Sequence, residues 1–417
     1  MKTINWVSLQ NLIGGNALGA EQAFGTPPLM IVHQGLKNDE HYINYMNNQR
    51  GLNIPVVQMD NEYTTFVTQE DENKFNDVVE NNHIHVAVMT PYCAGLSSLN
   101  ASSSGSKARG DANNDQNQNM YGLSDLGMRI GADVVTFENA PAAYTKAGQG
   151  VVDRLIEIAE SHDYSTHLLR TDTIHHGIPQ ARKRTFVTYF KNSLPPKFTY
   201  ESKEYTKLYD YLNEIPKDAS SQDITKGNIH TPLYDFVLSY TNKTSFLEAV
   251  STIPNAPATT TTLIAIEKIG FDKCIDWLKE RNQEGDEKYV KLLEHAKYKK
   301  SIGKSFWDSS SYVPNKGEFS NSVIGKHIHM QIVGDRPMNI REMMHLMGLP
   351  HDFEILEASK NWHALTQNVP TCTSAYICNE IKKYLNGELE ILSVPFVKQD
   401  NLFKRIDTNN MKNIDKW

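Results

Sequence analysis

Short apolar runs that alternate with polar, helix-compatible stretches over the first 190 residues restrict the fold of this chain most strongly. The runs IPVVQM (54–59), HVAVMT (85–90) and ADVVTFEN (132–139) have the length of buried strands. The stretches 70–82 and 150–162 between and after them have the composition of helices. This alternation predicts an α/β fold with a doubly wound, mostly parallel sheet covered by helices on both faces. Such sheets bind ligands at the carboxyl ends of their strands.

The pattern changes twice further along the chain. We therefore expect residues 1–190 to form the main α/β domain and residues 191–330 a smaller domain of mixed structure. Residues 331–390 regain amphipathic helices and return to the main domain, and residues 391–417 form a polar C-terminal tail.

Residues 95–122 form a long run of Ser, Asn, Gly and Asp with almost no apolar side chains. Two interpretations remain open, a disordered insertion and a mobile lid. Long loops inside compact domains are usually functional. The run starts two residues after Cys93, the one cysteine that ends a strand-like segment. This position favours the lid.

Composition narrows the class of protein. The net charge of −7 argues against a protein that coats nucleic acid nonspecifically. The four cysteines are too few and too scattered for a disulfide framework, and no metal-binding cluster is predicted. The sequence contains neither a signal peptide nor an apolar stretch of the ~20 residues that a membrane span requires. We expect an intracellular, cytoplasmic protein of prokaryotic or phage-like type.

Three short motifs follow one another at predicted strand ends: PYC (91–93), ENAP (138–141) and QARKR (180–184). Each alone has a plain interpretation, such as a packed thiol, a helix cap or a solvated basic strand. Together with RPMNIREMMHLMGLPHDFEI (336–355), their set and order resemble the DNA cytosine-5 methyltransferase family. The resemblance covers essentially the whole chain. It implies a class I methyltransferase-like catalytic domain and a target-recognition domain in residues 191–330.

The resemblance also implies a chemistry for the motifs. Cytosine C5 becomes nucleophilic when a thiolate adds to C6, and Cys93 is the expected nucleophile. The other expected catalytic residues, which stabilise the adduct and bind the base or its phosphate, are Glu138, Asn139, Gln180, Arg182 and Arg184. The base must be flipped out of double-stranded DNA. The expected DNA contacts of the 95–122 loop are Ser97, Lys107 and Arg109.

The segments that bind S-adenosylmethionine in the family depart from its pattern here. The expected cofactor-binding residues that remain are Gly14, Gly15 and Asp60. The residues that differ are Ser8, Gln10 and Leu12 in the glycine-rich turn, Gln34 or Gly35 at the ribose carboxylate, and Thr366-Gln367 at the closing Gly-Asn pair. Beside the nucleophile, Tyr92 replaces a proline and Ala94 a glutamine. The sequence predicts poor binding of S-adenosylmethionine, unless a nearby acid such as Asp39 or Glu40 replaces the carboxylate.

Three hypotheses follow. The chain is an ordinary methyltransferase with a divergent pocket, or it forms the Cys93 adduct and uses another one-carbon donor or none. In the third, it is a non-catalytic DNA-binding subunit that requires a partner. Intact Cys93, Glu138 and QARKR argue against the third, because a protein that only binds DNA has no use for the thiol.

Overall fold

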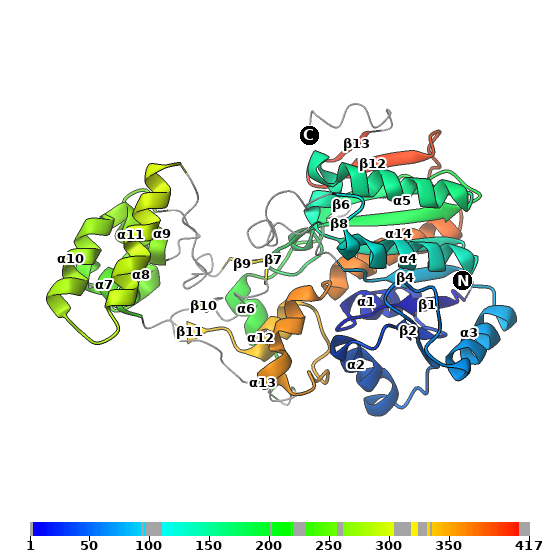
Figure 1. Cartoon of the computed structure of the whole chain (residues 1–417), viewed down its shortest axis with the longest axis horizontal. Coiled ribbons are helices and arrows are strands. Elements are labelled where there is room, and N and C mark those ends of the chain that lie inside the picture. The colour runs from blue at the N-terminus through cyan, green and yellow to red at the C-terminus, as the bar shows by residue number, and fades with distance from the viewer. Residues whose placement is uncertain are drawn as a thin grey trace.

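A computed structural model describes residues 3–92, 96, 111–200, 202–217, 219, 231–256, 262–303, 318–323, 332–333 and 336–407. Within these residues, nine strands form one sheet in the order β13-β12-β6-β8-β5-β4-β1-β2-β3 (Figure 1). Their bounds are β1 Trp6–Leu9, β2 Ile31–His33, β3 Val56–Gln58, β4 Val86–Met89, β5 Val134–Asn139, β6 Tyr164–Asp172, β8 Lys183–Lys191, β12 Phe396–Asp400 and β13 Arg405–Asp407.

Most neighbours in this sheet are parallel. The pairs β1–β2, β2–β3, β1–β4, β4–β5 and β12–β6 are parallel, whereas β8 is antiparallel to both β5 and β6, and β13 to β12. This arrangement confirms the predicted α/β fold with a mostly parallel sheet. Because β4 and β5 run in the same direction, their carboxyl ends meet at one edge, where PYC and ENAP begin.

Successive residues of the central strands enter opposite hydrophobic cores. Trp6, Val86 and Val88 pack into the core on one face, with helices α1 (Gly15–Phe24) and α14 (Thr371–Leu385). The residues Val7, Ala87 and Met89 enter the core on the other face, with helices α3 (Gln69–Asn81), α4 (Gln118–Arg129) and α5 (Gln149–Ser161). Burial of both faces explains why these strands are continuously apolar.

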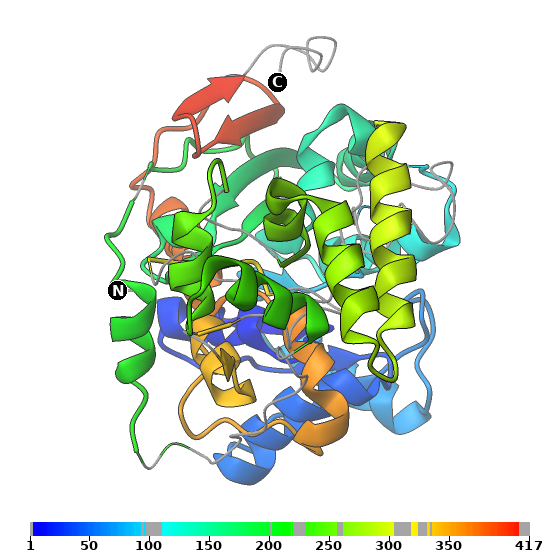
Figure 2. The ribbon, with the colours of Figure 1, turned by 90° about the vertical axis from the view of Figure 1, so that its left-hand side faces the viewer.

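A third hydrophobic core lies in a bundle of helices away from the sheet. These helices are α7 Pro232–Thr241, α8 Phe246–Thr252, α9 Thr262–Ile269, α10 Phe271–Arg281 and α11 Glu287–Ser301. Figure 1 shows the bundle set apart from the sheet, beside its carboxyl end, and in Figure 2 the bundle lies in front of the rest of the molecule. The smaller helices α6 Leu208–Asn213, α12 Ile340–Leu346 and α13 Ala358–Asn361 lie between the bundle and the sheet (Figure 1).

Four shorter segments complete the described elements. The strands β7 (Gln180–Ala181) and β9 (Ser320–Asn321) pair with each other, as do β10 (Ile332–Val333) and β11 (Arg336–Pro337). Helix α2 spans Lys37–Ile43. No helix among the described residues is long and apolar enough to cross a membrane.

Two segments differ from the sequence-based expectation. Residues 396–407, expected within a polar tail, form β12 and β13, because β12 adds to the edge of β6 through backbone hydrogen bonds that need no apolar pattern. Helix α4 begins at Gln118, inside the predicted 95–122 loop. Its Met120, Leu123 and Leu126 are buried at helical spacing and belong to the second core.

Candidate active site

Glu138 and Asn139 lie at the carboxyl end of β5, as the sequence predicts for a ligand-binding edge. Met89 of β4 is paired with Phe137, so the residues after β4 lie beside Glu138 and Asn139. Glu138 is only 7% exposed although it carries a carboxyl group. A buried acid of this kind needs a partner for its charge.

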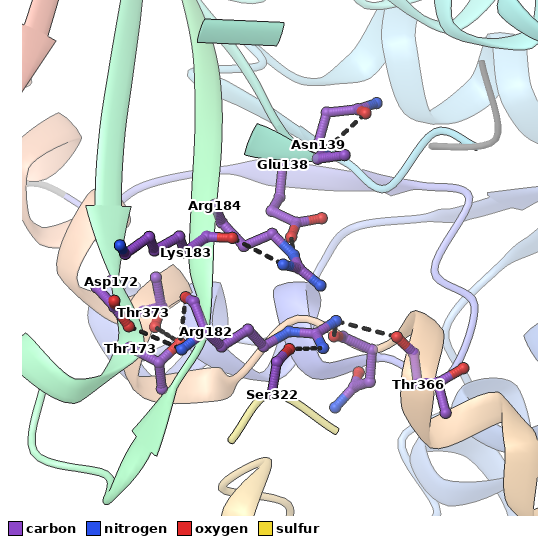
Figure 3. Close-up of polar contacts among 12 residues, drawn as sticks. Glu138, Asn139, Asp172, Thr173, Arg182, Lys183, Arg184, Ser322, Thr366 and Thr373 are labelled. Atoms are coloured by element: carbon purple, nitrogen blue, oxygen red, sulfur yellow. Dashed lines mark hydrogen bonds and ion pairs between the residues drawn. The ribbon is translucent and has the colours of Figure 1, made fainter. Parts of the chain in front are cut away.

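Arg184 provides that partner. Strand β8 runs antiparallel to β5 with Asn139 opposite Thr185, and this register places Arg184 next to Glu138. The distance between Arg184 Nε and Glu138 Oε1 is 2.5 Å (Figure 3). Burial raises the pKa of Glu138 above its ordinary value, although Arg184 and Arg182 both oppose the rise. The carboxyl group is therefore held ready to donate as well as to accept a hydrogen bond.

Arg182 and Gln180 lie in the same strand region but hold the backbone of distant segments. The Arg182 guanidinium, 2% exposed as a residue, donates to the carbonyl oxygens of Val323, Thr366 and Asn368 at 2.7, 3.0 and 2.9 Å. Figure 3 shows it directed toward Ser322 and Thr366, away from Arg184. The buried Gln180 donates to the Leu346 carbonyl at 2.7 Å and accepts from Val323 N at 3.2 Å. Of the QARKR side chains, Arg184 makes the ion pair with Glu138.

Tyr92 lies beside Asn139 and directly precedes the expected nucleophile. Asn139 Nδ2 lies 3.4 Å from the Tyr92 carbonyl oxygen. The Tyr92 backbone N–H donates to Asn119 Oδ1 at 3.1 Å, and its hydroxyl is hydrogen-bonded to Gln34 Nε2. Cys93 itself and the expected DNA contacts Ser97, Lys107 and Arg109 lie outside the described residues.

Two non-glycine residues in the turn between β1 and α1 adopt backbone conformations that favour glycine. Gln10 and Leu12 have φ values of 49° and 52°, in the left-handed region that glycine adopts most easily. The backbone N–H of Leu12 donates to Asp39 Oδ1 at 2.8 Å, and the Gln10 Oε1 accepts from Tyr63 and Asn119 at 2.8 Å each. These long-range contacts hold a backbone conformation that the side chains disfavour.

Gly14 and Gly15 lie where this turn enters α1. A Cβ at Gly14 would come within 2.3 Å of the Tyr42 ring, and one at Gly15 within 2.0 Å of the Val369 carbonyl oxygen. The side chain of Asn368 accepts a hydrogen bond from Gly15 N at 2.8 Å. The asparagine that closes this turn is thus Asn368, one residue after the Thr366-Gln367 pair that the sequence analysis expected. The sequence pattern does not reveal a shift of one residue in a loop. The hydrogen bond from Gly15 N to Asn368 identifies the asparagine.

The two residues directly after β2 are Gln34 and Gly35, and neither carries the carboxylate that the family resemblance requires for the ribose of S-adenosylmethionine. Gly35 has a φ of 83°, and a Cβ there would lie 2.3 Å from Gln58 Nε2. Gln34 is committed to Tyr92. Asp60, the expected adenine contact, accepts from Glu62 N, Thr64 N and the Thr64 hydroxyl of its own loop. Asp39 contacts the turn backbone at Leu12. Gly14, Gly15 and Asn368 keep their places in the turn, whereas Gln34, Asp39 and Asp60 are hydrogen-bonded to other groups of the protein.

Three possible metal ligands, His83, His85 and Asp133, gather at the opposite edge of the sheet, within 4.8 Å of one another. His85 Nδ1 accepts a hydrogen bond from Asn5 N at 3.0 Å. A neutral imidazole that accepts at Nδ1 carries its proton on Nε2, so Nε2 has no lone pair for a metal. His83 Nε2 lies 2.7 Å from Asp133 Oδ2, and this contact pairs the exposed His83 with the half-buried Asp133.

Two residues at the centre of these contacts, Asn119 and Tyr63, were not predicted from the sequence. Both are buried and both hydrogen-bond to Gln10. Asn119 follows a polar stretch that reads as a loop, and Tyr63 lies in the short segment after β3. The sequence signal for Asn119 was its place in a helix among the apolar residues Met120, Leu123 and Leu126. An asparagine buried there requires a hydrogen-bonding partner.

Residues 93–383 match the model of the C-5 cytosine-specific DNA methylase family. No curated protein sequence matches the chain.

Similar folds occur in solved structures. They include a DNA modification methyltransferase encoded within an E. coli prophage (18% identity, 92% of this chain and 99% of that chain covered, TM-score 0.55). Others are the Entamoeba histolytica methyltransferase EhMeth (12%, 92% and 99%, 0.53) and the S. pombe Dnmt2 methyltransferase (13%, 92% and 100%, 0.50). At these identities the likeness concerns the fold alone. The family model, which spans most of the chain, shows that this protein belongs to the C-5 cytosine-specific DNA methylases and is a DNA methyltransferase enzyme.

Proposed function

We propose that this enzyme flips a cytosine out of double-stranded DNA, adds the Cys93 thiolate to C6 and thereby activates C5 for modification. The observation that carries the proposal is the buried Glu138–Arg184 pair, since Asn139, the residue after Glu138, contacts Tyr92, which precedes Cys93 in the sequence. A charged pair at the carboxyl end of the sheet, next to a cysteine, is the arrangement that covalent catalysis on a base requires.

The movement of electrons in the cytosine ring gives Cys93 and Glu138 distinct roles. When the Cys93 sulfur forms its bond to C6, the electrons of the C5–C6 double bond move toward C5 and the ring nitrogen N3. Glu138 donates a hydrogen bond or a proton to N3, and its raised pKa suits this donation. C5 then bonds to an electrophilic one-carbon group, whose bond to its donor breaks with the electron pair leaving on the donor. The C5 proton is lost to solvent, the N3 proton returns to Glu138, and the S–C6 bond breaks with its electron pair on the Cys93 sulfur, which restores the aromatic ring.

Arg184 and Asn139 assist without forming covalent bonds. Arg184 keeps Glu138 oriented through their ion pair. Asn139 is buried, its Oδ1 accepts from Ala140 N at 2.8 Å and its Nδ2 is directed to the Tyr92 carbonyl oxygen, so it joins the end of β5 to the segment that carries the nucleophile. Gln180 and Arg182 support the site through the backbone carbonyls that they hold.

We assign the DNA contacts to two parts of the chain, the 95–122 loop and the helical bundle. Ser97, Lys107 and Arg109 would contact the flipped nucleotide and its phosphates, and the helical bundle α7–α11 would read the target sequence. The bundle has its own hydrophobic core and lies beside the carboxyl edge of the sheet, and both features support this assignment. No described contact requires a partner subunit.

For the cofactor, we propose that S-adenosylmethionine binds weakly or not at all. Gly35 cannot supply the ribose carboxylate, and Gln10 occupies the place of an aromatic side chain while its amide is bonded to Tyr63 and Asn119. Hydrogen bonds to a charged group contribute roughly 1.5–3 kcal/mol, so the missing carboxylate alone should weaken binding about tenfold to a hundredfold. This supports the hypothesis that the enzyme uses another one-carbon donor or none.

Covalent trapping tests the adduct. DNA with 5-fluorocytosine at the target position should form a stable complex with the wild-type enzyme and none with Cys93→Ala. The variants Cys274→Ala and Cys378→Ala are matched controls and should trap normally, because both thiols are buried and their pKa values are raised to about 12 by burial. Equal trapping by Cys93→Ala would place the nucleophile elsewhere.

Calorimetric titration tests the cofactor part separately. We expect no binding of S-adenosylmethionine in the micromolar range, with or without DNA. Micromolar affinity would contradict the altered pocket and return this enzyme to the ordinary S-adenosylmethionine-dependent members of its family, without affecting the adduct.

A further inference from the structure

Tyr92 is held at each of its three polar groups by a different amide side chain. Its backbone N–H donates to Asn119 Oδ1 at 3.1 Å, its carbonyl accepts from Asn139 Nδ2 at 3.4 Å, and its hydroxyl is bonded to Gln34 Nε2. These amides come from helix α4, strand β5 and the segment after β2, which are far apart in the sequence. We call Gln34, Asn119 and Asn139 the amide clamp.

The clamp coincides with a change next to the nucleophile. At the position of Tyr92, the family pattern has a proline. Proline fixes its own φ through its ring and carries no backbone donor, whereas tyrosine has a free φ and both an N–H and a hydroxyl. Asn119 binds the group that a proline lacks, so the clamp can restrict the same backbone torsion by hydrogen bonds.

The clamp also joins the residues at which the cofactor pocket departs from the family pattern. Gln34 lies at the position of the expected ribose carboxylate, and Gln10 lies in the altered turn. Asn119 Nδ2 donates to Gln10 Oε1 at 2.8 Å, so Asn119, 5% exposed, connects that turn to Tyr92. Hydrogen bonds thus connect Gln34 and, through Asn119, Gln10 to Tyr92. The amides at these altered positions therefore support the residue that precedes the nucleophile.

We propose that Asn119 and Gln34 are positioning residues that replace the restraint of a proline before Cys93 and orient the thiolate for attack on C6. The inference rests on the proposed function, because it takes Cys93 as the nucleophile. It assigns to the altered cofactor residues a role in the chemical step that does not depend on which donor the enzyme uses.

The test is the rate of adduct formation with 5-fluorocytosine DNA at saturating DNA and without cofactor. Asn119→Ala should slow this rate roughly tenfold, the effect of losing its hydrogen bond to the Tyr92 N–H, and leave the DNA dissociation constant unchanged. Tyr92→Phe, which removes only the hydroxyl bonded to Gln34, should slow it less. Adding Tyr92→Pro to Asn119→Ala should restore the rate, because the ring supplies the lost restraint without needing a partner for an N–H.

Asn117→Ala is the matched control. Asn117 is buried at the start of the same helix and donates to the Asp111 carbonyl at 2.8 Å, so its loss reports general destabilisation of this segment. The inference is wrong if Asn119→Ala reacts at the wild-type rate, if Asn117→Ala slows the rate equally, or if proline gives no rescue. A wild-type enzyme that forms no adduct would instead overturn the proposed function, and this inference with it.

Discussion

The two halves of the site lie at the same edge of one sheet but satisfy their buried polar groups in opposite ways. The half that handles the base pairs full charges, Glu138 with Arg184. The half at the β1–α1 turn uses amides, phenols and the carboxyl group of Asp39, and among the described residues Gln10 Nε2 and Gln34 Oε1 are buried without a hydrogen-bond partner. The Glu138–Arg184 pair lies where the proposed reaction develops charge in the cytosine ring. The amides of the turn half form hydrogen bonds mainly with other groups of the protein.

The largest expected effect distinguishes two neighbouring arginines. Arg182→Ala should lower the free energy of unfolding by several kcal/mol, because three carbonyl groups lose their donor and each unsatisfied group costs roughly 1–3 kcal/mol. Urea denaturation measures this loss. Arg184→Ala, the control, leaves the buried Glu138 without its ion-pair partner, so it should lower the denaturation midpoint less than Arg182→Ala does and should lose adduct formation. Equal midpoints for the two variants would contradict the structural role of Arg182.

Glu138→Gln tests whether the charged half acts in the chemical step. The rate of adduct formation should fall roughly a hundredfold or more, the usual scale for general acid–base catalysis. Because burial raises the pKa of Glu138, the wild-type rate should decline on the alkaline side as the carboxyl loses its proton. The variant should lose that decline and keep the rise that reports the thiolate. A variant with an unchanged pH profile would assign the proton to another group.

Asp39→Asn tests the turn half. Burial raises the pKa of Asp39 to about 7, although the N–H of Leu12 opposes the rise. Since this pKa lies above the ordinary value of 3.8, the unfolded chain releases this proton first, and folding stability falls as the pH rises from 4 to 7. Each pH unit in that interval contributes roughly 1.4 kcal/mol.

The asparagine variant keeps an oxygen for Leu12 N and cannot ionise. The difference in free energy of unfolding between wild type and variant should therefore change between pH 4 and 7 and level off above pH 7. Thermal or urea unfolding at several pH values measures it. A difference that is independent of pH would mean that Asp39 ionises normally in the folded enzyme.

The strands and helices of the main domain were predictable because their signal is local. The run 132–139 is apolar on both faces of β5, and 150–162 has the helical spacing that buries Val151, Leu155 and Ala159 in α5. Strand β12 was not predicted, because Lys398, Gln399 and Asp400 are buried polar residues whose partners, including the Tyr144 carbonyl and Phe198, lie elsewhere in the chain.

The sequence alone determined the order of strands and helices, the family, and the residue types at the ends of β4, β5 and β8, because periodicity and short motifs are contained within a few consecutive residues. Only the tertiary structure decided which amide contacts which backbone. Asn119 and Gln10 are 109 residues apart, Arg182 and Thr366 are 184 apart, and Asn368 and Gly15 are 353 apart. A hydrogen bond requires its two atoms to lie about 3 Å apart in the correct direction, and only the packed chain sets that distance.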